Sequence, residues 1–167
     1  MGSRVELKSL KVIESQSQET LCYSATVYLD GKPVLYASND GRGGADLFLR
    51  HERATAPEHH ELLRLARAWV ESRPAPPWWN ESESYSHFVA GTHDETLLEW
   101  MMAELIAAKR EEQTLRRWCR TSIVLRAPGA EPGHYQRLRV RFDPNDVRQT
   151  RTIAERYPDH EIVNLRF

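Results

Sequence analysis

The stretch LCYSATVYLDGKPVLYASN, residues 21–39, decides the fold of this chain. The β-branched and aromatic residues in its first half alternate between two faces, which predicts a strand. One of these faces carries Tyr23, Ala25, Val27 and Leu29. The Asp30-Gly31 pair that follows favours a two-residue type I′ turn, because both central residues of that turn need a positive φ. The segment KPVLYASN then returns as a second strand, so we predict an antiparallel β-hairpin.

The composition is that of an ordinary globular domain. The chain has 167 residues, of which 40% are hydrophobic and 28% charged, and its formal net charge is -1. This length suffices for a core without disulfides. Cys22 and Cys119 lack the spacing of a zinc ribbon or of a disulfide framework. The N-terminus has no apolar signal segment, and no apolar run is long enough to span a membrane. We therefore expect a cytoplasmic protein with reduced cysteines and no membrane partner.

Hydrophobic periodicity places the other elements. Residues 57–72 predict one helix, and residues from about 92 to 119 predict a longer one, in which Thr92 and Glu95 have the spacing of a capping box. Asp143 is expected to cap a third, short helix. This short helix is expected over residues 143–157. The remaining predicted elements are strands at residues 7–13, 121–126, 134–142 and 161–165.

The order of these elements predicts an α+β fold. We expect a single domain over residues 1–167, in which an antiparallel sheet of about five to six strands packs against two main helices and one short helix. Its parts are an N-terminal hairpin region with a glycine-rich loop at 1–50, a helical region at 57–119 with a connector at 73–86, and a C-terminal β-β-α-β region at 120–167.

The segment SNDGRGGAD, residues 38–46, which we call the glycine loop, directly follows the hairpin. Its candidate binding residues are Asn39, Asp40, Gly41, Arg42, Gly43, Gly44 and Asp46. It lacks the lysine and hydroxyl residues of a P-loop and the glycine spacing of a dinucleotide site. It also lacks the alternating oxygen ligands of an EF-hand. Two interpretations stay open: a turn in which glycine supplies positive φ, and a rigid loop that docks on another chain.

The span CYSATVYLDGKPVLYASNDGRGGADLF, Cys22 to Phe48, resembles a pattern near the N-terminus of small bacterial, phage and mobile-element proteins that have no established activity. The shared features are the SATVYLDGK hairpin and the NDGxGG motif after it. The C-terminal half is similar only in its layout of strand, hairpin, short helix and final strand. The resemblance implies the context of an accessory gene and no particular chemistry.

Candidate catalytic residues are few. The seven histidines include no HExxH motif, and zinc needs three or four converging ligands. The His93-Asp94 dipeptide is typical of HD-type phosphohydrolases, but aspartate is also favoured at a helix start by the helix dipole. The sequence contains neither a GxSxG motif nor a close Cys-His pair, the patterns that would indicate a catalytic nucleophile. We expect no catalytic residue, metal or cofactor. A metal-dependent hydrolase or small-ligand-binding protein that uses Asp40, Asp46 and histidines is kept as an alternative.

Two further features are candidate binding surfaces. Alternation in the strand expected at 134–142 places three arginines on one face, which an arginine of the preceding strand would join. This candidate basic face consists of Arg126, Arg137, Arg139 and Arg141. Guanidinium groups bind carboxylates and phosphates, so the face suits an acidic protein surface, nucleic acid or plain solvation. Trp78 and Trp79 follow a proline run and are candidate aromatic anchors, either of an interface or of the core.

These features favour a non-enzymatic accessory protein, related to phages or mobile elements, that binds a macromolecular partner and inhibits or modulates a host or defence complex. The partner that we expect is another protein. Nucleic-acid binding through the basic face is a second alternative, and a homodimer stays open.

Overall fold

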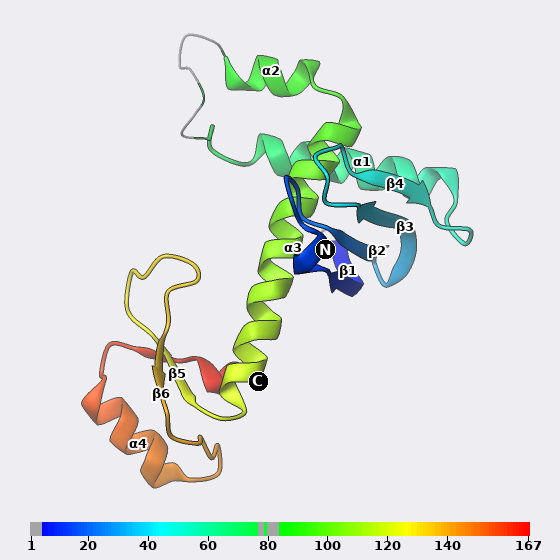
Figure 1. Ribbon diagram of the computed structural model, residues 1–167. Coiled ribbons are helices and arrows are strands. Elements are labelled where there is room, and N and C mark those ends of the chain that lie inside the picture. Colours follow the sequence, from blue (N-terminus) through cyan, green and yellow to red (C-terminus); the bar gives the residue numbers. More distant parts are fainter. Residues whose placement is uncertain (1–4, 77–78, 80–83) are drawn as a thin grey trace. The chain divides into compact units, whose positions relative to one another are not determined.

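The computed structural model describes residues 5–76, 79 and 84–167 (Figure 1). These residues form four α-helices and two antiparallel sheets, so the predicted α+β class is confirmed. The strands do not share the single sheet that the sequence predicts, but divide into a four-stranded and a three-stranded sheet. The chain itself divides into two compact units, residues 1–106 and 107–167. None of the helices within the described residues has the length and apolar character needed to cross a membrane.

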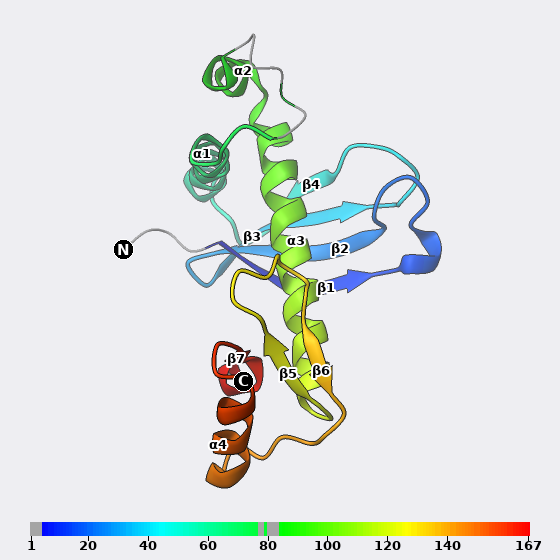
Figure 2. The same ribbon diagram turned by 90° about the vertical axis from the view of Figure 1, so that its left-hand side faces the viewer.

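The sheet of the first unit is an antiparallel meander. Its strands are β1 (Val5–Val12), β2 (Tyr23–Leu29), β3 (Lys32–Asn39) and β4 (Leu47–Arg50), in that spatial order (Figure 2). The predicted hairpin is β2–β3, and its turn has the expected positive φ angles, 47° at Asp30 and 79° at Gly31. The sequence did not predict β4, because a four-residue segment is too short to show a period.

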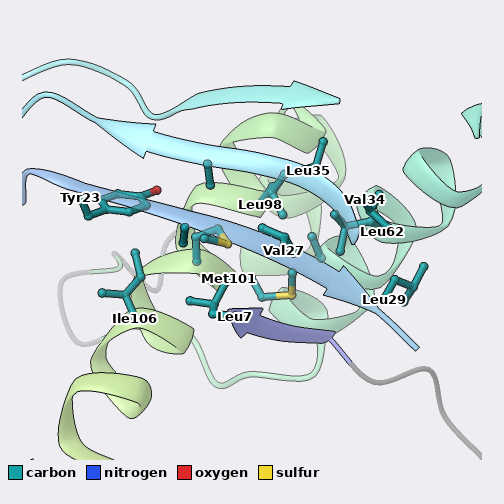
Figure 3. Packing of buried hydrophobic residues seen from close by; sticks show 14 residues of the cluster. Leu7, Tyr23, Val27, Leu29, Val34, Leu35, Leu62, Leu98, Met101 and Ile106 are labelled. Carbon is teal, nitrogen blue, oxygen red and sulfur yellow. The ribbon is translucent and has the colours of Figure 1, made fainter. Parts of the chain in front are cut away.

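Two helices cover one face of this sheet. They are α1 (Ala56–Glu71) and α3 (Asp94–Cys119), both close to the predicted bounds. The face of β2 that carries Tyr23, Ala25, Val27 and Leu29 is buried, and its side chains pack against apolar residues of both helices (Figure 3). The cluster includes Tyr23, Val27 and Leu29 of β2, Leu35 of β3, Leu62 of α1, and Leu98, Met101 and Ile106 of α3. Burial of each large aliphatic side chain contributes about 1.5–3 kcal/mol, so this core fixes the first unit.

The connector between α1 and α3 contains a helix that the sequence did not predict. This helix, α2 (Tyr85–Gly91), begins inside the expected connector at 73–86 and ends just before α3. The capping box predicted from Thr92 and Glu95 is wrong. The Thr92 hydroxyl donates instead to the backbone carbonyl of Phe88 (2.8 Å), and α3 begins only two residues later. Thr92 therefore belongs to the end of α2 rather than to the start of α3.

The second unit is built around a short buried strand. This strand, β5 (Ile123–Arg126), lies between β6 (Gln136–Leu138) and β7 (Glu161–Ile162). One face of β5 packs against α4 (Val147–Arg156), and the other face packs against the end of α3 and the C-terminal turn. Because both faces are covered, the first three residues of β5 are all apolar.

A buried asparagine fastens the C-terminal turn of this unit. The Asn164 side-chain oxygen accepts a hydrogen bond from the Val124 N–H (2.7 Å). Its amide donates to the backbone carbonyls of Ser122 (2.9 Å) and Cys119 (3.2 Å). A buried polar group is tolerated when it is hydrogen-bonded in this way, so Asn164 links β5, α3 and the C-terminal turn without leaving an unsatisfied atom.

Two local predictions in the second unit are wrong. The strand expected over 134–142 ends at Leu138, because the backbone turns there and the N–H of Val140 donates to the Leu138 carbonyl (2.7 Å). The cap of α4 is not Asp143. It is Asp146, whose carboxylate accepts from two backbone N–H groups in the first turn of the helix. The single domain expected over the whole chain stays a prediction.

The end of β6 gives a direct test of the second unit. Strand alternation would bury Val140 and Phe142 equally, but Val140 is 55% exposed, whereas Phe142 is 9% exposed and packs with Ile153 of α4. We expect Phe142→Ala to lower the free energy of unfolding by about 2–4 kcal/mol, because it leaves a cavity. Val140→Ala should change it by less than about 0.5 kcal/mol. Urea titrations followed by circular dichroism measure both, and equal losses would contradict this packing.

Candidate functional site

The glycine loop is held together by its own polar side chains and by those of Thr20 and Tyr23. The Asn39 side-chain oxygen accepts from the Gly41 N–H (2.8 Å) and from the Thr20 hydroxyl (2.7 Å). The Asn39 amide donates to the Asp46 carboxylate (3.0 Å), whose other oxygen accepts from the Tyr23 hydroxyl. Burial and this carboxylate raise the pKa of Tyr23, so the hydroxyl stays protonated and donates. Asn39 and Asp46 are therefore engaged inside the fold.

Close contacts account for two of the three glycines. Gly41 has a φ of 83°, and a β-carbon there would overlap the backbone carbonyl of Gln16. Gly43 has a φ of 86°, and a β-carbon there would overlap the Glu19 carboxylate. Gly44, by contrast, has open space around it. The turn interpretation thus explains why glycine is needed at positions 41 and 43.

The exposed members of the loop are the ones that a partner could contact. Asp40, Arg42, Gly43 and Gly44 are exposed, and the Asp40 carboxylate accepts only a local bond, from the Arg42 N–H (3.1 Å). Asn39, Gly41 and Asp46, which form the base of the loop, therefore stabilise the fold. Docking by the exposed tip stays a prediction.

A matched pair of glycine substitutions tests this division. Gly41→Ala should lower the free energy of unfolding by roughly 2–4 kcal/mol, because it adds a positive-φ penalty to a backbone clash. Gly44→Ala adds the same methyl group in open space and should change it by less than about 0.5 kcal/mol. Thermal or urea unfolding of the two variants measures the difference, and similar stabilities would show that the loop is not packed as described.

The residues of the metal alternative do not converge. In the described part of the chain, no group of three or more His, Cys, Asp or Glu side chains could hold a metal ion. Asp94 of the HD dipeptide binds Arg67 instead, and His93 is exposed. His51 is buried, and its Nδ1 atom accepts a backbone N–H (3.1 Å). Both cysteines are free, and burial raises the pKa of the Cys119 thiol.

The four arginines of the predicted basic face do not form one ladder. Arg137 in β6 lies over the Trp118 ring, with 4.8 Å between the guanidinium carbon and the ring centroid. Arg126 in β5 donates to a backbone carbonyl in the turn after that strand (3.1 Å). Arg139 and Arg141 lie beyond the end of β6 and are exposed. The strand that was expected to align Arg137, Arg139 and Arg141 is too short to do so.

Trp79 belongs to an aromatic cluster, whereas Trp78 lies outside the described residues. The Trp79 ring centroid is 5.4 Å from that of Tyr85 and 4.5 Å from that of Phe88, both in α2. Phe88 in turn stacks on Trp100 of α3, with centroids 6.0 Å apart. These distances are typical of attractive aromatic pairs, so the cluster connects the residues before α2 with α3.

A pocket of about 480 Å³, which we call the aromatic pocket, lies beside this cluster. Its aromatic walls are Trp69 at the end of α1, Tyr85 of α2 and Trp100 of α3. The other lining residues are Val70, Arg73, Pro74, Pro76, Ala103 and Glu104. The Arg73 guanidinium lies over the Trp69 ring, 4.5 Å from its centroid. A hollow of this size with aromatic walls and few polar groups is typical of binding sites.

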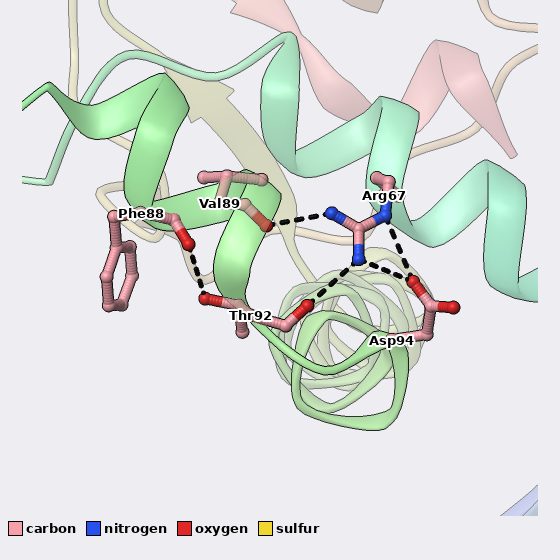
Figure 4. A network of polar contacts seen from close by, with 5 residues as sticks. All are labelled: Arg67, Phe88, Val89, Thr92 and Asp94. Atoms are coloured by element: carbon pink, nitrogen blue, oxygen red, sulfur yellow. Dashed lines mark hydrogen bonds and ion pairs between the residues drawn. The ribbon is translucent and has the colours of Figure 1, made fainter.

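The side chain of Arg67 holds the three helices around the pocket in place (Figure 4). Its guanidinium donates to the carbonyls of Val89 (2.8 Å) and Thr92 (2.9 Å), at the end of α2. It also donates two hydrogen bonds to the Asp94 carboxylate, at the start of α3 (3.0 and 2.7 Å). Arginine presents its donors in a rigid fork, so this one residue of α1 fixes the junction of α2 and α3. We call these contacts the Arg67 network.

Replacing this arginine should loosen α2. Arg67→Gln removes the ion pair and most donors, so we expect the free energy of unfolding to fall by about 1–3 kcal/mol. Amide exchange should accelerate over residues 85–91, because α2 loses its anchor. Arg64→Gln is the matched control, since Arg64 lies one turn earlier on α1, is exposed and pairs with Glu61 of the same helix. Hydrogen-exchange mass spectrometry measures the effect. Equal exchange in both variants would contradict the anchoring role.

Comparison of the chain with protein-family models, with curated proteins and with solved structures gave no match. The candidate site therefore rests on its own geometry. Sequence reasoning singled out Trp79 but not Trp69, Tyr85 or Trp100. Trp69 lies in an apolar helical stripe, where a tryptophan is expected in the core, and Tyr85 lies in the expected connector. The available signal was the placement of Trp69 and Trp100 on the helices that flank a proline- and tryptophan-containing connector.

Proposed function

We propose that this chain is a non-enzymatic binding protein that receives an apolar anchor side chain of a protein partner in the aromatic pocket. The observation that carries the proposal is the set of three aromatic walls around a hollow of about 480 Å³. Tryptophan and tyrosine are enriched among the residues that dominate interface energies. A partner side chain that enters such a hollow leaves water for an apolar environment, which favours binding.

The polar residues of the pocket would orient the partner. Arg73 and Glu104 supply one charge of each sign among the lining residues. The Arg73 guanidinium lies over the Trp69 ring, and its N–H groups can donate to a carboxylate or carbonyl of the partner. The Glu104 side chain can accept a hydrogen bond from the same partner. A few polar groups at the edge of an apolar hollow give orientation, while the aromatic walls give most of the affinity.

The resemblance of Cys22–Phe48 to phage and mobile-element proteins supports a host or defence complex as the partner, with inhibition or modulation as the effect. The two alternatives have weaker support. In the metal-dependent alternative, Asp46 would have to leave its bonds to Tyr23 and Asn39. In the nucleic-acid alternative, the arginines would have to act without the shared strand that was expected to align them.

Filling the pocket tests the proposed function. Ala103 is an exposed lining residue on α3, so Ala103→Arg places a long side chain in the hollow without removing core contacts. Arginine is also a good helix former. We expect this variant to fold as the wild type does and to bind the partner at least about tenfold more weakly, a loss of about 1.4 kcal/mol. Capture from a bacterial lysate identifies the partner, and calorimetric titration then measures the affinity.

Ala68→Arg is the matched control, because Ala68 is an exposed alanine on α1 that does not line the pocket. Its affinity for the partner should equal that of the wild type. Gly44→Arg, at the open tip of the glycine loop, tests the competing docking site in the same titration. Full affinity in Ala103→Arg, or loss only in Gly44→Arg, would reject the aromatic pocket as the binding site.

A further inference from the structure

The four-stranded sheet has two edges of different character. At one edge, β1 is interrupted by a bulge at Ser9, which has a φ of 54°, and the strand carries the exposed Lys8 and Lys11. Bulges and lysines are features that keep an edge strand from pairing with another chain. At the other edge, β4 pairs regularly with β3, and its Leu47 and Leu49 are each 54% exposed. Within the described residues, no strand pairs with the free side of β4.

The alternation of hydrogen bonds identifies the backbone groups on that free side. The His51 N–H donates to the Val34 carbonyl (2.9 Å), in continuation of the β3–β4 register. Bonded and non-bonded residue pairs alternate along an antiparallel ladder. The backbone groups of the two leucines therefore face β3, whereas the N–H and carbonyl groups of Phe48 and Arg50 face away from it. These outward groups can pair with another strand.

The sequence of this edge is complementary to itself. In antiparallel pairing centred on Phe48, Asp46 of one copy lies opposite Arg50 of a second copy, and the two leucines lie opposite each other. The Glu99 carboxylate, which accepts the Asp46 N–H (2.8 Å), adds a second negative charge at the same end. Arg50 is exposed and forms no ion pair with a described residue. Each end of the paired edge would thus bring one guanidinium to two carboxylates.

We propose that β4 is a homodimer interface at which a second copy of this chain pairs in this register, so that the two sheets continue into one. The two-fold axis passes through Phe48, as the isologous contact of a symmetric dimer requires. The outward N–H groups of Phe48 and Arg50 each reach a carbonyl of the other copy, and the bond from Asp46 to Glu99 stays in place. Tyr36, which lies opposite Leu49 in β3, extends the apolar surface beside the paired strands.

The dimer should be weak and dependent on concentration, because a four-residue edge buries less than the roughly 1,200 Å² of stable complexes. Sedimentation equilibrium from micromolar to millimolar protein should show the mass rising from 19.4 kDa towards twice that value. Leu49→Lys and Arg50→Glu should each shift the rise to at least about tenfold higher concentration, because they add charge or repulsion at the contact. A wild-type protein that stays monomeric over this range would overturn the proposal.

Two exposed residues outside the edge supply matched controls. Leu165→Lys repeats the leucine change at a position that is 60% exposed, and Arg53→Glu repeats the charge reversal just after β4. Both should dimerise as the wild type does. Dimerisation that responds equally to the edge and control variants would place the interface elsewhere and would also overturn the proposal.

Cross-linking tests the register independently of stability. Leu47 and Leu49 of different copies would form a non-bonded pair, with α-carbons about 4.5 Å apart, which suits a disulfide. A mixture of Leu47→Cys and Leu49→Cys proteins should form a mixed disulfide faster than either variant forms a disulfide with itself. The unmodified chain, with its native cysteines, is the control. Equal cross-linking in the mixture and in the two single-variant samples would reject this register.

Discussion

The packing of α3 against the inner face of the sheet positions every other part of the first unit. Leu98 and Met102 are fully buried there, so the helix can neither rotate nor slide without exposing them. The rest of the helix surface is fixed as a result. Asp94 meets the guanidinium of α1, Glu99 reaches the start of β4, and Trp100 lines the aromatic pocket. One buried stripe thus sets the geometry of both surfaces that we propose for binding.

The elements that the sequence predicts well are those whose own period specifies them. The alternation from Tyr23 to Leu29 specifies a strand with one covered and one open face, whichever element covers it. Asp30-Gly31 specifies its turn through the positive φ angles of these two residues alone. The apolar stripes of α1 and α3 are likewise long enough to identify each helix without its partner. For these segments local preference and tertiary packing agree, which is why their bounds differ so little from expectation.

The missed elements depend on contacts that no local pattern encodes. β4 is a strand because its backbone pairs with that of β3. α2 is a short helix whose last turn accepts a hydrogen bond from Arg67. β6 ends at Leu138 although the alternation of its sequence continues. Which strands share a sheet depends on their pairing partners, so the separate three-stranded sheet could not be predicted from single segments. The aromatic pocket was missed for the same reason. In the sequence, Trp69 belongs to an apolar helical stripe and Trp100 is one residue of a long helix, and only the placement of α2 makes them walls of a hollow.

The glycine loop and the aromatic pocket differ in what they leave for a partner to satisfy. The polar atoms of Asn39 and Asp46 already bond to groups within the fold, and water can complete the hydration of the exposed tip, so a partner at the loop gains little. Water in the pocket cannot form comparable bonds with indole and phenol faces, and its release favours binding. A conspicuous glycine-rich motif can therefore stabilise the fold without binding a partner. The aromatic pocket, whose side chains first look like core residues, is the surface at which a partner gains more binding free energy.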